Sequence, residues 1–158
     1  LAGGSHSQGG QHRRDECGVR QGLGGQEVKW SVDTNVLIRA VVQDDPAQAR
    51  KASKLLTQAE LIAVALPCLC EFVWVLLKVY KFKNTDASAA IRALIATANV
   101  QVNRPAVEAG LALLDAGGDF ADGVIAHEGS WLGGDTFVSF DRQAVSLLVG
   151  QGLAARLL

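Results

Sequence analysis

The chain has little cysteine, no long hydrophobic run and no methionine at all. Cys17, Cys68 and Cys70 are odd in number and lack the spacing of zinc or redox motifs, so we expect free thiols in a reducing cytosol. The longest apolar stretches are interrupted by Glu71 and Lys78, and none is long enough to span a bilayer. These absences argue against a disulfide-stapled fold, a zinc module and a membrane protein.

An excess of either charge is also absent, since acidic and basic residues nearly balance. A net charge of −1 gives no sign of a strongly electrostatic nucleic-acid or membrane binder. An RNA substrate is still possible, because catalytic acids offset local basic patches in the sum. The chain also has no glycine-rich phosphate loop with the usual Lys-Ser/Thr and no serine in a nucleophile elbow. What is present is a chain of 158 residues, 49% of them hydrophobic, enough for one domain with a real core.

The first part of the chain differs sharply from the rest. Residues 1–27 are rich in Gly, Gln and Arg and nearly lack bulky apolar side chains, so we expect a disordered N-terminal extension. The extension has no apolar core of a secretory signal. The folded domain is predicted over residues 28–158. Because the first apolar strand opens at Val28 and methionine is absent, we expect a non-standard start codon there.

From Val28 onward, hydrophobic periodicity predicts strands that alternate with helices. The predicted strands cover residues 28–32, 61–66, 100–102, 136–140 and 154–158. The predicted helices follow Asp33, open at Asp44-Asp45-Pro46, cover 67–80, 85–98 and 105–114, and run from Asp119 to about Leu132 and from Asp141 to Val149. This alternation indicates an α/β fold, a three-layer α/β/α sandwich with a mostly parallel central sheet. Ligands bind beyond the carboxyl ends of such strands, where Asp33 and Asp141 fall.

Four carboxylates stand out in this pattern: Asp33, Glu71, Asp122 and Asp141. Three lie where a helix begins, and Glu71 interrupts one of the most apolar stretches. A buried carboxylate is costly unless it is paired or neutralised, and converging carboxylates repel one another unless a divalent cation lies between them. An all-oxygen donor set suits Mg²⁺ or Mn²⁺, which commonly act on phosphates and lower the pKa of a bound water. The residues therefore predict a metal-dependent enzyme site.

Each acid also has a structural explanation, and the residues alone leave both open. Asp33 and Asp141 precede helices, where aspartate is a common N-cap, although Thr34 or Asn35 offers another cap for the first of these helices. Glu71, on a helix predicted to be buried, needs either a buried cationic partner or a functional role.

Neighbouring residues give weaker signals. Asp119 and Asp122 fit a capping-box-like arrangement, with Asp119 as the cap. Ser139, two residues before Asp141, could bond a metal-bound water or a phosphate, and is equally an ordinary strand serine. His127 lies roughly off the helical face of Asp122 and fits a packed or surface histidine better than a general base.

Four short motifs occur in the order found in PIN-domain ribonucleases, and the chain most resembles the VapC toxins of bacterial type II toxin–antitoxin pairs. They are Val32-Asp-Thr-Asn-Val-Leu-Ile38, Cys70-Glu-Phe72, Gly118-Asp-Phe-Ala-Asp-Gly123 and Val138-Ser-Phe-Asp-Arg142. The resemblance runs from about Val28 to Leu158 and matches Asp33, Glu71, Asp122 and Asp141 to the acidic quartet of the family. Asp119 matches an extra acid of some members. At Gly123 many relatives carry alanine, so glycine should loosen the helix start slightly.

The resemblance implies a PIN-like sandwich and an endoribonuclease that cleaves single-stranded or loop RNA. It implies one or two Mg²⁺ or Mn²⁺ ions, a metal-activated water, and products with a 5′-phosphate and a 3′-hydroxyl. It also implies a cytoplasmic homodimer and a small antitoxin partner that inserts near the site.

Basic residues beside an acidic site can grip flanking phosphates, and solvated surface charge is the simpler explanation for each of them. The candidates are Arg39, Lys78, Lys81, Lys83 and Arg142. Two alternatives keep the fold and change the role: a PIN nuclease for RNA processing, and a PIN-like protein-binding module without catalysis. A haloacid dehalogenase-type phosphatase is disfavoured, because it needs a second aspartate where this chain has Asn35.

Overall fold

The computed structural model describes residues 28–158, so the predicted disorder of residues 1–27 lies outside the described residues. Helices and strands alternate along the chain as predicted, with boundaries shifted by one to three residues. In chain order they are β1 (Lys29–Ser31), α1 (Thr34–Val42), α2 (Pro46–Gln58), β2 (Leu61–Ala63), α3 (Leu66–Lys78), α4 (Asn84–Ile95), β3 (Val100–Gln101), α5 (Arg104–Asp115), α6 (Phe120–Trp131), β4 (Phe137–Ser139), α7 (Arg142–Gly150) and β5 (Ala155–Leu157). None of the helices in this part of the chain combines the length and the apolar character needed to cross a membrane.

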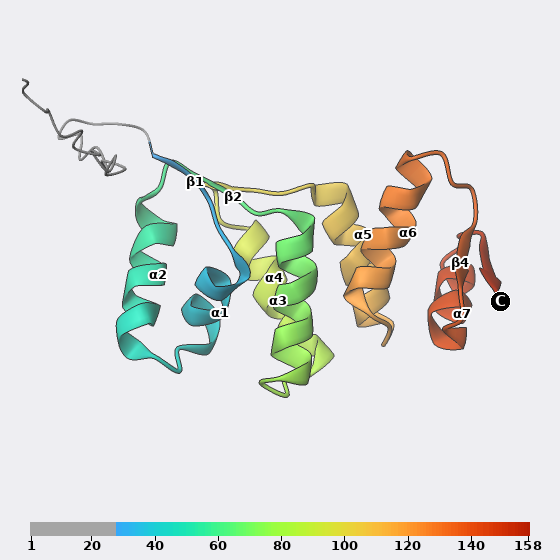
Figure 1. The fold of residues 1–158 in the computed structure, drawn as a ribbon, viewed down its shortest axis with the longest axis horizontal. Coiled ribbons are helices and arrows are strands. Elements are labelled where there is room, and N and C mark those ends of the chain that lie inside the picture. The colour runs from blue at the N-terminus through green and yellow to red at the C-terminus, as the bar shows by residue number, and fades with distance from the viewer. Residues whose placement is uncertain (1–27) are drawn as a thin grey trace, which may run out of the picture.

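All strand pairs in residues 28–158 are parallel, which confirms the predicted α/β fold. The strands lie in two sheets, however, where we expected one central sheet. One sheet has the order β1-β2-β3, and β4 pairs with β5 in the other. Figure 1 shows β4 beside α7 at the C-terminal end, while β1 and β2 lie with α1 to α4. Strands of two or three residues make few ladder hydrogen bonds, so each sheet depends on the helices packed beside it.

The core lies around α3, which buries one side and exposes the other. Leu69, Phe72 and Leu76 are almost completely buried among apolar side chains of the neighbouring elements. The opposite side of α3 carries Trp74, whose surface is 54% exposed, and Glu71, which is also exposed. The expectation that α3 is buried all round is therefore wrong for this face, although its apolar sequence pointed to a fully packed helix.

Helices α5 and α6 approach each other closely, and two glycines make this possible. A Cβ atom at Gly123 would lie 2.5 Å from the carbonyl oxygen of Ala109 and 2.9 Å from Cα of Gly110. A Cβ atom at Gly110 would lie 2.6 Å from the ring of Phe120. The prediction that Gly123 merely loosens the start of α6 missed this role, because the contact joins two helices and is invisible in the local sequence.

Candidate active site

Asp33 is the N-cap of α1. Its backbone is extended, and its Oδ1 accepts a hydrogen bond of 3.1 Å from the backbone N–H of Val36. The expectation that Thr34 or Asn35 would cap this helix is wrong, because α1 begins at Thr34 itself. Capping uses one oxygen of the carboxylate, and Oδ2 receives no hydrogen bond from residues 28–158. Asp33 is an exposed residue, so its carboxylate is accessible from solvent.

Glu71 is joined to the start of α1 by a buried threonine. The hydroxyl of Thr34, only 7% exposed, donates a hydrogen bond of 2.6 Å to Oε2 of Glu71. Glu71 itself is exposed, which corrects the expectation of a buried acid, because α3 turns this position away from its packed side. None of the ion pairs among residues 28–158 involves Glu71. The presence of Glu71 on α3 is therefore explained neither by an ion pair with a buried basic residue nor by packing in the core.

The thiol of Cys68 places Asp33 and Glu71 in one neighbourhood. Burial raises the pKa of the Cys68 thiol, a hydrogen bond with Thr34 lowers it, and the charges of Asp33 and Glu71 raise it further. Cys68 and Cys70 are free thiols, as predicted, while Cys17 lies outside the described residues. With a raised pKa, the Cys68 thiol stays protonated at neutral pH and is a poor nucleophile.

Two further acids begin helices on the C-terminal side of the molecule. Asp119 is the N-cap of α6 and accepts a hydrogen bond of 2.7 Å from the N–H of Ala121. Asp141 is the N-cap of α7 and accepts hydrogen bonds from the N–H groups of Gln143 and Ala144 at 2.7 and 3.1 Å. Both caps were predicted, and each uses only Oδ1 of its carboxylate in the described residues.

Asp122 lies in the first turn of α6 and is half-buried. Burial raises the pKa of the Asp122 carboxyl above its usual value, and the charges of Asp119 and Asp141 raise it further. No hydrogen bond contributes to this shift. The three acids therefore repel one another across a small space, which a nearby cation would relieve.

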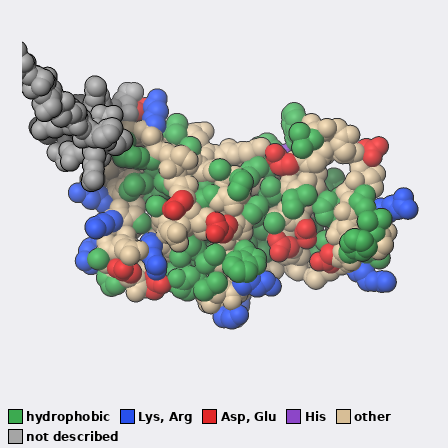
Figure 2. Space-filling view, in the orientation of Figure 1, with side chains coloured by type: hydrophobic (Ala, Val, Ile, Leu, Met, Phe, Trp, Pro, Cys, Tyr) green, Lys and Arg blue, Asp and Glu red, His purple; other side chains and the backbone are tan. Residues whose placement is uncertain are grey.

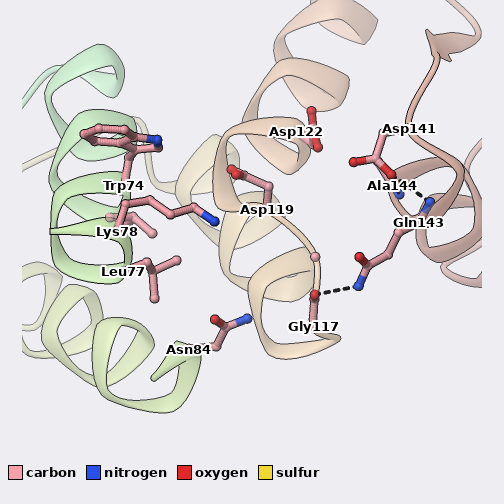
Figure 3. Close-up of a pocket in the computed structure, with 12 residues that line it drawn as sticks. Trp74, Leu77, Lys78, Asn84, Gly117, Asp119, Asp122, Asp141, Gln143 and Ala144 are labelled. Atoms are coloured by element: carbon pink, nitrogen blue, oxygen red, sulfur yellow. Dashed lines mark hydrogen bonds between the residues drawn. The ribbon is translucent and has the colours of Figure 1, made fainter. Parts of the chain in front are cut away.

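These three acids line one pocket with a volume of about 260 Å³ (Figure 3). The opposite wall comes from α3, and the floor from the loop before α6 and the start of α4. The lining residues are Val73, Trp74, Leu77, Lys78, Asn84, Gly117, Gly118, Asp119, Asp122, Asp141, Gln143 and Ala144. Asp33 and Glu71 are not part of this lining, so the acids predicted to converge fall into two groups.

The carboxylate oxygens of these acids are the kind of ligand that a hard divalent cation prefers. Every candidate ligand is a carboxylate, and at least one oxygen of each receives no hydrogen bond within residues 28–158. Over the same residues, no three His, Cys, Asp or Glu side chains lie close enough together to hold an ion. Mg²⁺ usually takes only one or two carboxylates and fills its remaining positions with water and substrate phosphates. Asp122 with Asp141 meets that requirement.

Of the residues predicted to contact substrate, Lys78 lines the pocket, whereas the lining does not include Ser139, Arg39, Lys81, Lys83 or Arg142. Arg39 forms an ion pair of 2.5 Å with Asp44, which also accepts a hydrogen bond of 2.8 Å from the hydroxyl of Tyr80. Arg142 is exposed on the first turn of α7. The Oγ atom of Ser139 accepts the N–H of Asp141 at 3.0 Å, so this serine supports the loop that carries the acid.

His127 is packed, one of the two placements expected for it, and its exclusion from catalysis stays a prediction. It is half-buried, and its ring lies 6.4 Å from that of Trp131, centroid to centroid.

Trp74 is one of the pocket residues that sequence reasoning missed. The apolar run of α3 hid it, because a tryptophan among valines and leucines is typical of a core helix. The available signal was spacing: Glu71, Trp74 and Lys78 recur at the period of one helical face.

The parallel strands, with carboxylates at the starts of α1, α6 and α7, define an α/β protein with an acidic pocket. The chain matches the PIN domain model over residues 31–145 and belongs to that family. Members of the family are generally nucleases, so the family suggests nuclease activity for the chain. Among curated proteins, none matches the chain significantly.

Proposed function

We propose that this protein is a Mg²⁺- or Mn²⁺-dependent endoribonuclease and the toxin of a cytoplasmic toxin–antitoxin pair. The observation that carries the proposal is the meeting of Asp119, Asp122 and Asp141 at one pocket, with the pKa of Asp122 raised by burial and by its two neighbours. A structural acid cluster usually gains a basic partner. The ion pairs among residues 28–158 include none of these three acids.

The proposed metal ligands are Asp122 and Asp141, with Asp119 beside them and Asp33 and Glu71 completing the acidic set. A bound divalent ion would neutralise phosphate oxygens and supply a water of lowered pKa. The chain's own contribution is orientation: the N-cap bonds of Asp119 and Asp141 fix the carboxylates at helix N-termini. The N-terminal dipoles of α6 and α7 add positive potential at the same place, which favours a phosphate.

The proposal includes a homodimer and a small antitoxin. Large apolar side chains exposed at the C-terminal end support a protein partner, since solvent contact of such side chains is unfavourable. Figure 2 shows hydrophobic side chains gathered over this end. The most exposed are Trp131, Leu132 and Phe140, at 78%, 89% and 80%.

A catalytically idle PIN-like module is the second candidate. It is favoured by one observation, namely that no three acids among residues 28–158 lie within reach of one ion. Activity separates the candidates, because the idle module binds protein without cutting RNA.

The test is cleavage of total cellular RNA by the purified protein, followed by mapping of new RNA 5′ ends. We expect cuts with Mg²⁺ or Mn²⁺ that stop with EDTA and return when Mn²⁺ is added back. Asp141→Asn is compared with the wild type, because asparagine keeps the N-cap hydrogen bonds and removes only the charge. Cleavage that resists chelation, or equal cleavage by the variant, would contradict the proposal.

A further inference from the structure

The α3 wall of the acidic pocket carries an aromatic side chain and a cation one helical turn apart. Trp74 and Lys78 both line the pocket that Asp119 and Asp122 line from α6. In Figure 3 the Lys78 side chain extends from α3 in the direction of Asp119, and the Trp74 indole lies above it on the same wall. A pocket with acids on one side and an aromatic–cation pair on the other has two chemically different halves.

Neither side chain is explained by the fold. The surface of Trp74 is 54% exposed, whereas Phe72 on the packed side of the same helix is almost completely buried. Lys78 is absent from the ion pairs formed within residues 28–158. An exposed indole, and an ammonium group that forms no ion pair with residues 28–158, can both contact a ligand.

We propose that Trp74 and Lys78 form a subsite for one nucleotide of single-stranded RNA, an inference that rests on the proposed nuclease function. The indole stacks on an unpaired base, and the ammonium group contacts the phosphate of the same nucleotide. Side chains one turn apart on a helix have Cβ atoms about 6 Å apart, comparable to the reach from a base to its backbone phosphate. The next phosphodiester then lies over the carboxylates of α6 and α7.

The side chains on the α3 wall favour unpaired RNA over duplex RNA. Stacking on an aromatic side chain requires a base that is free of its neighbours, so a duplex cannot use Trp74. Because every base has a π-face, the subsite tolerates different bases, and Lys78 adds a salt-dependent contact. This subsite therefore contributes affinity for an unpaired strand and leaves the choice of sequence to other contacts.

The experiment measures binding of a fluorescein-labelled, random-sequence short oligoribonucleotide by anisotropy in EDTA, where cleavage is absent. Trp74→Leu is expected to weaken binding roughly tenfold, as for loss of one stacked base, while Trp74→Phe retains most of the affinity. Trp30→Leu is the matched control, since Trp30 is 46% exposed and outside the pocket lining. The difference in affinity between Trp74→Leu and the wild type should disappear when the ligand is an abasic strand of equal length or duplex RNA.

Lys78→Gln is expected to reduce the slope of log affinity against log salt by about 0.7, the value for one phosphate contact on a single strand. Lys54→Gln, an exposed lysine on α2, should leave the slope unchanged.

Equal binding by the Trp74→Leu and Trp30→Leu variants would overturn the subsite. So would an equal loss on the abasic strand, since Trp74 would then act through the structure of α3. A change in oligomeric state caused by Trp74→Leu would assign the indole to a protein interface instead. Cleavage by the wild-type protein is measured separately. Cutting without a Trp74 effect removes only the subsite, and Trp74-dependent binding without cutting removes only the nuclease proposal.

Discussion

The hydroxyl of Thr34 donates a hydrogen bond of 2.6 Å to Glu71 across 37 residues of sequence. It ties the first turn of α1 to the exposed side of α3, and its Thr34 end is buried while its Glu71 end is exposed. A hydrogen bond to a carboxylate restricts the rotamer of that side chain and is stronger than a bond between neutral groups. Thr34 therefore fixes the orientation of the Glu71 carboxylate.

Replacing Thr34 by valine removes this hydrogen bond and preserves the shape of the side chain. We expect kcat for RNA cleavage to fall roughly tenfold, the equivalent of about 1.4 kcal/mol in the barrier. KM should change little, because Thr34 lies outside the pocket lining. Thr34→Ser is the matched control and should keep most of the activity. Normal kcat in the valine variant would show that Glu71 needs no such positioning.

Asp122→Asn should stabilise the metal-free protein while abolishing cleavage. Burial and the charges of Asp119 and Asp141 raise the pKa of this carboxyl, so ionising it is harder in the folded state than in the unfolded state. The wild type therefore loses stability as pH rises through the folded pKa, and the variant does not. At pH 7 we expect a gain of less than about 1 kcal/mol, since solvent screens the carboxylate.

Urea unfolding at several pH values measures this gain. The difference between Asp122→Asn and the wild type should vanish well below the ordinary pKa of an aspartate, because the carboxyl is then protonated in both the folded and the unfolded state. If Asp122→Asn were less stable than the wild type at pH 7, another group would have to compensate the negative charge of Asp122 in the folded state.

Gly123→Ala should destabilise the protein although alanine is the better helix former. The new Cβ atom would meet the backbone of Ala109 at 2.5 Å, and backbone cannot move without shifting α5. We expect a loss of about 1–3 kcal/mol in the free energy of unfolding. Gly129→Ala in the same helix is the matched control, because nothing lies within 4 Å of its Cβ position. That variant should gain roughly 0.5–1 kcal/mol. Equal effects at both positions would contradict the close contact.

Mn²⁺ should raise the melting temperature of the wild type and have much less effect on Asp141→Asn. An ion that binds only the folded state stabilises it by about 2.7 kcal/mol at a concentration of 100 times Kd. Calorimetry with and without the ion measures the shift, and NaCl at the same ionic strength controls for general screening. Identical shifts in both proteins would remove Asp141 from the ion site.

The helix caps and the positions of most helices and strands could be predicted from local sequence. Asp119 and Asp141 precede helices, and both are N-caps as expected. Alternating apolar and polar residues located the strands and helices, because these patterns report the period of each element. Glu71 shows the opposite case: its apolar neighbours indicated burial, yet the packing of α3 leaves it exposed.

The sequence by itself determined the helices, their caps and the acidic residues at their starts, because capping and periodicity depend on near neighbours. Only the tertiary structure decided that the strands form two sheets, that Gly123 lies against the backbone of α5, and that Trp74 shares a pocket with three acids. These relationships join residues distant in sequence, and they depend on which face of each helix its neighbours cover.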